Sequence, residues 1–520
     1  MKKSYLITLL FLFGFLLSFS TYAQQNVKGK VSSKEDGMPL PGASILIQGT
    51  STGTVTDIDG MYSIEVPNQN SVLIFSFIGF DKKTLKVGTS TKLDVILAAS
   101  ASDLDEVIVT AFGISQDKKA LGYAAQSIDS EAITTSRQPN VVNALQGQVA
   151  GVQVTSSGGA PGQSARIVIR GINSLDPSAN NQPLFVVDGV PVDNSTFESG
   201  GTPRGMSNRI ADINPNDIET MSVLKGAAAT ALYGVRAANG AVIITTKKGK
   251  AGQVQVNFNS SIGIDKLVKK PNLQDKYGQG FSGERDDSSF WPSWGASIAN
   301  ENDPNYIYQD NWTRAFDTGL NIDNSLSVSG GNEKATFYSS FGRTDQKGII
   351  PFSTWDRTTA KLSGTIKASE KFNMSASINF SNSGGNRVPH DRFLERMMYW
   401  SETTDVRDYI NEDGTMKSYG NTNPIYDARF ATYKDDVNRV IGNINLNYSP
   451  TDWLMFSYRL GTDFYSDSRE EILPGPKGVE GEIVLDKDGF IEETRINSKD
   501  ISSNFYITLK KQWNDNFNPT

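Results

Sequence analysis

The chain has 520 residues, with 57 acidic and 50 basic side chains, a formal net charge of −7 and a pI near 5.1. This acidic balance argues against a nucleic-acid partner, because nucleic-acid binding favours a basic surface. The sequence has no cysteine and a single histidine, His390, which excludes disulfides and cysteine nucleophiles and argues against a zinc site. We therefore expect no metal and no cofactor.

The N-terminus has the features of an export signal. Lys2 and Lys3 precede an apolar run from Leu6 to Phe19, and small residues end at Ala23. This run is short for a membrane helix and lies in the range of signal peptides. We expect residues 1–23 to be a signal peptide that is cut near Ala23. No later run is long and apolar enough to span as a helix, so a role in the membrane requires a β-barrel.

Residues 24–98 are expected to fold as a small β-sandwich. Six short β-prone segments are separated by turn signals, at 27–33, 43–49, 62–66, 71–77, 82–87 and 92–97. The stretch GKVSSKEDGMPLPGASILIQGTSTGTVTDIDGMYSIEV closely resembles the carboxypeptidase-regulatory-like domain, a transthyretin-like sandwich. That resemblance implies an accessory module without catalytic activity.

Residues 99–113 are predicted to be a linker that carries an isolated β-prone segment. Alanine and serine form a tether over 98–104, and Val107, Ile108 and Val109 then favour an extended strand. Such a strand can pair with an exposed sheet edge of a partner through main-chain hydrogen bonds. The alternative is that this stretch is the last strand of the sandwich. The candidate contact residues are Asp105, Glu106, Val107, Ile108, Val109 and Thr110.

Residues 114–250 mix apolar strands with helical pieces and are predicted to be an α+β domain. Strands are expected at 165–172, 183–192, 220–224 and 241–249, and helical pieces at 140–149 and 227–234. Residues 227–231 are all small, so the second helical piece can lie close to a sheet. Gly226, Gly234 and Gly240 permit turns that bulkier residues resist.

Residues 251–520 are predicted to be part of a transmembrane β-barrel. In KFNMSASINFSN (371–382) apolar and polar residues alternate strictly, which indicates a strand with one apolar and one polar face. About eight such strands are expected, at 253–264, 324–330, 335–344, 357–368, 371–382, 438–449, 452–466 and 503–513.

The connections between these strands alternate between short turns and long segments. Short turns lie at 331–334, 369–372 and 450–453, and longer segments follow 344, 382 and 466. A polar inner face, an apolar outer face and alternating loop lengths are typical of an outer-membrane barrel. The alternative is a soluble sandwich with one hydrated face.

The motifs that suggest catalysis lack their structural context. GTSTG (49–53) matches a nucleophile elbow, but a strand follows it and the sole histidine is distant. GQGFSG (278–283) matches a dinucleotide loop with no strand before it, and DIDG (57–60) and DKDG (486–489) lack the other calcium ligands. His390 is expected to be a surface-loop residue. We predict that the chain is not an enzyme.

Together, these segments resemble one family closely, the SusC/RagA-type TonB-linked outer-membrane transporters. The resemblance covers nearly the whole chain after residue 23. Its most specific stretches are NALQGQVAGVQVTSSGGAPGQSARIVIRGINSL, PLFVVDGVPVDN and INPNDIETMSVLKGAAATALYGVRAANGAVIITTKKGK. The resemblance makes 114–250 a plug held inside the barrel, and Asp105–Thr110 the segment that contacts TonB.

The resemblance implies active import across the outer membrane, energised by TonB and its inner-membrane complex. A SusD-like lipoprotein is the implied partner, and a glycan or oligosaccharide is the expected ligand; a peptide or another ligand is the alternative. The N-terminal domain is expected in the periplasm. A non-transporting receptor or adhesin and a secreted hydrolase are the competing classes. Substrate identity and substrate-contact residues cannot be derived from the sequence.

Two further expectations concern the barrel and its long loops. Transporters of this type have about 22 strands around the plug, and a barrel of eight strands has no room for one. We therefore expect this sequence to be a fragment that lacks most of the barrel. Aromatic residues in the long loops could stack on sugars or form interface girdles, and these are Trp291, Trp294, Trp312, Tyr399 and Trp400.

Overall fold

The computed structural model describes residues 25–509 except 49, 51, 78–79, 99–106, 110–114, 118–124, 157, 177–179, 196–205, 291–292, 301, 413, 418–419, 421 and 475–488. The predicted signal peptide therefore lies outside the described residues. The chain divides into two compact units, 1–107 with 117–119, and 108–116 with 120–520. Among the described residues, no helix has the length and apolar character needed to cross a membrane.

The first unit contains the predicted sandwich. One sheet has the strand order β4-β1-β7 and the other β3-β2-β5-β6. The prediction identifies six of the seven strands and misses β3, which is too short to show alternation. The strands are β1 (Gln25–Ser33), β2 (Ser44–Ile47), β3 (Gly53–Val55), β4 (Met61–Val66), β5 (Val72–Ser76), β6 (Lys83–Lys86) and β7 (Val95–Leu97).

Alternation along these strands supplies the core of the sandwich. In β4, Tyr62, Ile64 and Val66 are buried while the residues between them are exposed. The ring of Tyr62 lies edge-on to Phe75 of β5, with ring centroids 5.4 Å apart. Leu73 and Phe75 are fully buried, so the two sheets are joined by an apolar layer of their own.

The plug elements belong to the second unit, where five strands form a sheet of order β10-β15-β16-β13-β14 and β11 pairs with β12. The strands predicted at 165–172, 220–224 and 241–249 are confirmed. The single strand predicted at 183–192 is wrong, because a turn at Asp188 and Gly189 divides it into the antiparallel strands β13 and β14. The elements β10, α2 and β11 were not predicted. The elements are β10 (Ala125–Asp129), α2 (Ser130–Thr135), η2 (Val141–Leu145), β11 (Val152–Ser156), β12 (Ala165–Ile169), β13 (Leu184–Val187), β14 (Val190–Val192), η3 (Arg209–Asp212), η4 (Pro215–Asp217), β15 (Ile218–Leu224), α3 (Ala227–Tyr233), η5 (Gly234–Ala237) and β16 (Ala241–Thr246).

The alanine-rich segment, which connects β15 to β16 in the chain, packs closely against their sheet, as its small residues predict. Ala229, Ala237 and Leu224 are fully buried in one apolar cluster. Gly240 has a φ of +93°, and a Cβ there would lie 2.9 Å from the carbonyl oxygen of Leu224. A side chain at this position is therefore excluded both by conformation and by space.

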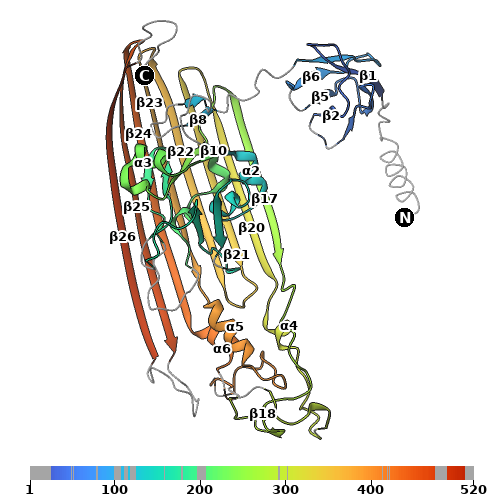
Figure 1. The fold of residues 1–520 in the computed structure, drawn as a ribbon, viewed down its shortest axis with the longest axis vertical. Helices are drawn as coiled ribbons and strands as arrows, with labels where there is room; N and C mark the ends of the chain where they lie inside the picture. Colours follow the sequence, from blue (N-terminus) through green and yellow to red (C-terminus); the bar gives the residue numbers. More distant parts are fainter. Residues whose placement is uncertain are drawn as a thin grey trace, which may run out of the picture. The chain divides into compact units, whose positions relative to one another are not determined.

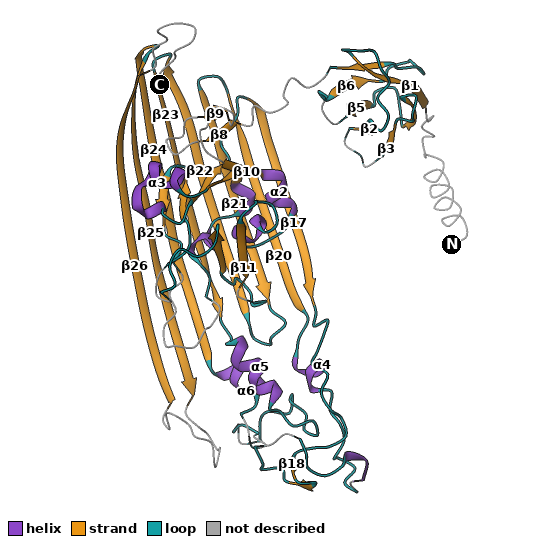
Figure 2. Cartoon of the chain, viewed as in Figure 1, coloured by secondary structure: helices purple, strands orange, loops and turns teal. Residues whose placement is uncertain are grey.

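Eight long antiparallel strands form one continuous sheet, and the plug elements lie against one of its faces (Figures 1 and 2). All eight predicted strands are present. Within the described residues the sheet is open, with β17 and β26 at its edges. The strands are β17 (Gly252–Asp265), β20 (Gly319–Gly331), β21 (Ala335–Lys347), β22 (Thr354–Ser369), β23 (Phe372–Asn386), β24 (Thr432–Thr451), β25 (Leu454–Pro474) and β26 (Gly489–Leu509).

The two faces of the sheet differ as the alternation predicts. On β22, Leu362 is 60% exposed on the outer face, while its neighbour Lys361 on the plug side is 1% exposed. Ile378, Leu460 and Ile501 continue the exposed apolar row on the neighbouring strands. The outer face therefore suits hydrocarbon, and the inner face meets the plug through polar groups.

The strands are longer than predicted, and the predicted start of the last strand at 503 is wrong, while its predicted end at 513 lies outside the described residues. That strand begins at Gly489, and β25 continues to Pro474 instead of ending at 466. In this region the outward positions of β25 are Ser466, Ser468 and Glu470, so alternation of apolar and polar residues ends while pairing continues. The end of a strand with polar residues on both faces is exposed to water, and a pattern of alternating hydropathy does not predict it.

The long connections fold into a cap with its own apolar core, at the end of the sheet opposite the short turns (Figure 2). Trp312, Phe393 and Trp400 belong to this core. The cap elements are β18 (Gly280–Phe281), β19 (Glu284–Arg285), η6 (Ile298–Asn300), α4 (Asn311–Ala315), α5 (His390–Met398) and α6 (Pro424–Phe430).

We predict that residues 25–98 fold independently, because their core is complete within the sandwich. Leu73→Ala should lower the free energy of unfolding by about 3 kcal/mol, through loss of buried contacts and creation of a cavity. Ile58 is 82% exposed, so Ile58→Ala should change the stability by less than about 0.5 kcal/mol. Urea denaturation followed by circular dichroism measures both. A non-cooperative transition in the unsubstituted fragment would contradict the prediction.

Candidate functional site

The candidate site is the polar contact between the plug and the sheet, centred on residues 207–217. This segment is buried almost throughout, although its sequence SNRIADINPND is mostly polar. It folds as two 3₁₀ turns, η3 and η4. Asn214 caps η4 by accepting a hydrogen bond from the Asn216 amide, and Pro215 stands at the first position of the turn. These short turns leave backbone carbonyls available to side chains of the sheet.

Arg357 of β22 binds the plug backbone directly. Its Nη1 donates to the carbonyl oxygens of Ala211 at 2.6 Å, and of Ile213 and Pro139 at 3.1 Å. The side chain is 2% exposed. The guanidinium fork thus joins η3 to the segment before η2, and its position depends on the backbone of the plug.

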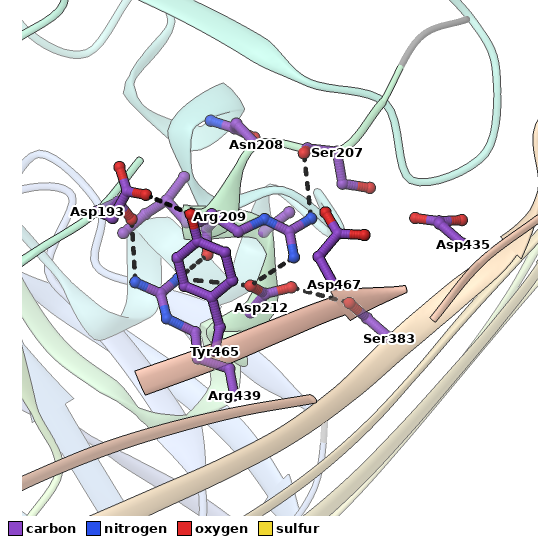
Figure 3. A network of polar contacts seen from close by, with 12 residues as sticks. Asp193, Ser207, Asn208, Arg209, Asp212, Ser383, Asp435, Arg439, Tyr465 and Asp467 are labelled. Carbon is purple, nitrogen blue, oxygen red and sulfur yellow. Dashed lines mark hydrogen bonds and ion pairs between the residues drawn. The ribbon is translucent and has the colours of Figure 1, made fainter. Parts of the chain in front are cut away.

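Arg439 of β24 forms the centre of a network of buried charges (Figure 3). Its Nε and Nη2 donate to both carboxylate oxygens of Asp463, at 2.8 and 2.7 Å, and Nη2 also donates to the carbonyl oxygen of Asp193 at 2.9 Å. On the plug side, Nη1 lies 3.4 Å from Oδ2 of Asp212, which also pairs with Arg209 at 3.5 Å. Charges from plug and sheet therefore balance within one buried cluster.

Arg387, which follows β23, forms a third attachment. It makes a two-pronged ion pair with Asp435, at 2.8 and 3.0 Å. The same guanidinium donates to the carbonyl oxygen of Pro161 at 2.6 Å and to the hydroxyl of Ser207 at 2.9 Å. Thus three strands or their ends each direct one arginine at the plug.

Asp193 of the plug accepts hydrogen bonds from the sheet and from its own loop. Tyr465 of β25 donates its hydroxyl to Oδ2 at 2.7 Å, and Ser195 donates both its amide and its hydroxyl. Burial opposes ionisation of this carboxyl, but the hydrogen bonds and the charge of Arg439 outweigh burial and lower the pKa of Asp193. The carboxylate thus remains charged in the folded contact.

The site was not predicted from the sequence. A lone arginine at an inward position of an alternating strand looks like any other polar residue that faces water, and only tertiary structure aligns it with a plug carbonyl. One sequence feature could have indicated the plug–sheet contact. The inner faces of the strands are rich in serine and asparagine, and a few large cationic side chains interrupt them, namely Arg357, Lys361, Arg439 and Arg459.

The predicted partner-contact segment is only partly described. Val107–Val109 form the strand β8, which pairs with β9 (Ser115–Asp117) and belongs to neither sheet of the sandwich. Asp105, Glu106 and Thr110 lie outside the described residues. A strand therefore forms at the β-prone residues, next to the plug in sequence.

The aromatic candidates of the long loops separate into two groups. Trp400 is 4% exposed and lies in the core of the cap, so it is not available to stack on a ligand, and Trp312 is partly buried against the same core. Trp294 and Tyr399 are 61% and 43% exposed. Trp294 has a φ of +78° and lies 6.0 Å, between ring centroids, from Tyr277. Trp291 lies outside the described residues.

The expectation that His390 is a surface-loop residue is wrong. It begins α5, its side chain is 13% exposed, and its Nε2 lies 3.1 Å from Oδ1 of Asp391. In the part of the chain that the structure describes, no group of three or more potential metal ligands comes together.

The arrangement of the plug–sheet site is suited to holding a domain in place, since its donors are directed at backbone and carboxylate groups.

Arg357→Met should loosen the plug, because the substitution leaves buried carbonyl groups without a donor. We expect the contact to weaken by about 3 kcal/mol. In the full-length protein, hydrogen exchange in residues 207–217 should accelerate, and cells should become sensitive to vancomycin, which is too large for porins. Arg495→Met is the matched control because Arg495 is exposed on β26. Unchanged exchange in the Arg357 variant would contradict the role of this arginine.

A second prediction concerns pH and the cap, where Glu402 is 8% exposed. Burial raises the pKa of Glu402 above its ordinary 4.5, although hydrogen bonds from Ser293 and Gln274 oppose the shift. A raised pKa in the folded state means that the cap gains stability as pH falls through that pKa towards 4.5. Hydrogen exchange around 274–310 should therefore slow on acidification, and Glu402→Gln should abolish the effect. The exposed Glu412 provides the control, Glu412→Gln.

Comparison with known proteins agrees with this architecture. Residues 117–241 match the family described as TonB-dependent Receptor Plug Domain, and residues 27–109 match the CarboxypepD_reg-like domain. A plug bound against the inner face of a long antiparallel sheet defines the class of TonB-dependent receptors. More specifically, the chain is of the SusC/RagA type.

The relatives place the chain within that class. The TonB-dependent receptor SusC of Bacteroides thetaiotaomicron is 33% identical over 480 residues, covering 86% of this chain and 45% of the relative. The TonB-dependent receptor P26 of Formosa agariphila is 31% identical over 453 residues, covering 85% and 43%. The chain thus spans less than half the length of these relatives. The RagAB peptide importer in its open-open state has a similar fold, with a TM-score of 0.59 and 23% identity over 79% of this chain and 47% of that chain.

Proposed function

We propose that the protein imports a hydrophilic nutrient across the outer membrane, driven by TonB. The observation that supports this most strongly is the plug–sheet contact, in which buried arginines of β22 to β24 hold backbone groups of residues 207–217. Hydrogen bonds and ion pairs of this kind can be exchanged for water when the plug is displaced, whereas an apolar interface resists hydration. A plug held in this way can be both secure at rest and releasable.

The internal cores support the same proposal. The plug has an apolar cluster of its own, to which the sheet contributes only Ile441 among the buried members. The plug can therefore remain folded in large part while its contact with the sheet loosens. A pull through residues 105–110 then acts on the plug without having to unfold it completely.

We propose that Asp105–Thr110 contact TonB in the periplasm through β-pairing. Main-chain pairing needs an extended segment with few side-chain requirements, and Val107–Val109 form a strand. TonB and its inner-membrane complex supply the energy in this scheme. The sandwich at residues 25–97 would then lie on the periplasmic side, since it precedes the contact segment.

We propose a glycan or oligosaccharide as the ligand, captured with a SusD-like lipoprotein at the cap. The support is chemical: Trp294 and Tyr399 offer exposed aromatic surface on the cap, whereas Trp400 is buried, and aromatic rings pack well on sugar faces. A peptide is the second candidate, because the similar fold of RagAB is that of a peptide importer. We propose no enzymatic activity, as the named relatives are receptors.

Ile108→Pro tests the coupling. Proline removes a backbone donor and disrupts strand pairing. In the full-length protein, uptake should be abolished while barrel assembly and surface binding of ligand persist. The control is Ser100→Pro, in the alanine- and serine-rich tether, which should leave uptake unchanged. Normal uptake by the Ile108 variant would exclude this segment as the coupling site, and binding without TonB-dependent uptake in the unsubstituted protein would favour a receptor or adhesin.

A further inference from the structure

The plug contacts the two halves of the sheet in different ways. The buried arginines of the sheet that contact the plug lie on β22, β24 and β25 and just after β23, whereas β17 and β20 line the space beside the plug with glutamine, asparagine and serine side chains. Their pairing across the strands makes one continuous polar strip, with Gln255 opposite Ser329, Asn257 opposite Ser327 and Asn259 opposite Ser325.

A cavity of about 360 Å³ separates this strip from the plug. Its plug side is formed by Asn216, Glu219, Lys247, Lys248, Lys250 and Ala251, and its sheet side begins at Gly252. Gly252 pairs with Gly331 beside the short turn that joins β20 to β21. The cavity therefore extends from the middle of the sheet to the end where the short turns lie.

A second cavity continues along the same two strands towards the cap. It has about 30 Å³, and Ser261, Asn321 and Asp323 form its sheet side. Asn216 lines both cavities. Its Nδ2 donates to Oδ2 of Asp323 at 3.2 Å, and Thr344 donates its hydroxyl to the other carboxylate oxygen at 2.6 Å. The side chain of Asn216 thus separates the two cavities, which would be continuous without it.

The lining of the larger cavity indicates what it can accommodate. The amide and hydroxyl groups of the strip both donate and accept hydrogen bonds, which suits hydroxyl-rich or amide-rich chains. Three lysines and one glutamate line the plug side, and Lys250 pairs with Glu219 at 3.3 Å. The positive charge of Lys247 and Lys248 remains in excess, which favours anionic over cationic groups.

We propose that the space between the plug and the β17–β20 strip is the passage for a hydrophilic, neutral or anionic chain, and that the Asn216–Asp323 contact closes it. This inference rests on the proposed transport function and adds the wall along which the ligand moves. Opening on this side requires the hydrogen bond between Asn216 and Asp323 to break and the plug to shift away from β20, because the smaller cavity has only about 30 Å³ and Arg357 also lines it.

Cysteine reporters in the purified full-length protein test the passage, since the 520 residues contain no cysteine. Ser327→Cys reports the larger cavity, Ser261→Cys reports the smaller one, and Asn443→Cys, buried on β24, is the control. The probe is sulfonatoethyl methanethiosulfonate, a small anionic thiol reagent. Ser327→Cys should react readily, and the other two should react slowly.

Removing the contact should open the smaller cavity. Asn216→Ala should accelerate the reaction of Ser261→Cys about tenfold, as expected for loss of one hydrogen bond to a charged group, and leave the Ser327→Cys and Asn443→Cys rates unchanged. Asn216→Asp should do the same by repelling Asp323, so one poorly folded variant does not decide the result. An unchanged Ser261→Cys rate in both variants would overturn the proposed closure.

Two further measurements separate the passage from the transport function. At Ser327→Cys, the ratio of the anionic reagent's rate to that of its trimethylammonium analogue should be several-fold higher than the same ratio measured with a small free thiol, and an equal or lower ratio would refute the preference for anionic groups. In cells, energised TonB should accelerate labelling of Ser261→Cys. If the purified protein behaves as expected but TonB has no effect, the coupling to TonB fails while the passage stands. If Ser327→Cys is as slow as Asn443→Cys, the passage itself fails.

Discussion

Buried guanidinium groups of the sheet that bind backbone carbonyls of the plug are the interaction on which the rest of this structure depends. Arg357 donates to the carbonyl oxygen of Ala211 and Arg439 to that of Arg209, so each joins a strand to the main chain of η3. Such donors recognise a backbone conformation, so the contact exists only where residues 207–217 adopt their two 3₁₀ turns. In turn, a charged arginine on the inner face requires these acceptors, because an unpaired buried charge is strongly unfavourable.

The alternation of the strands has the same origin. A sheet whose outer face meets hydrocarbon must place its polar side chains inside, and the inside must then satisfy them. The plug supplies many of the partners. Its sheet and helices have a separate apolar core, so polar attachment to the wall does not compromise the fold of the plug. The division between an apolar interior and a polar interface is what permits a domain to be both stable and movable.

The contact between plug and sheet also differs from strand to strand, and a model of how the plug moves has to include this difference. Cations bind the plug tightly on β22 to β24, whereas β17 and β20 face it across amide and hydroxyl groups and a cavity. The cap shows a comparable division of roles. Trp400 is 4% exposed and Trp294 is 61% exposed, although the sequence places both in the long loops between strands. The first stabilises the cap, and only the second offers surface to a ligand.

The sequence by itself determined the fold class and the order of its parts. Period-two alternation revealed all eight wall strands, and short turns with β-prone segments revealed six of the seven sandwich strands, because these signals are local. The strand bounds were less accurate where the outward residues become polar, as in β25 beyond Phe464 and the first half of β26. The small residues of the segment that connects β15 to β16 also predicted that this segment packs closely against the sheet, since the size of a side chain sets how near two backbones can approach.

Only the tertiary structure decided which polar residues form the plug–sheet contact. Arg357 lies more than a hundred residues from the carbonyl groups of Ala211 and Ile213 that it binds, and its local pattern is that of any inward polar position. The same holds for Asn216 and Asp323, for the burial of Trp400 and for the partial burial of Trp312 and His390. Hydrogen bonds and burial between distant segments depend on the register and curvature of the assembled sheet, which no local pattern of residues encodes.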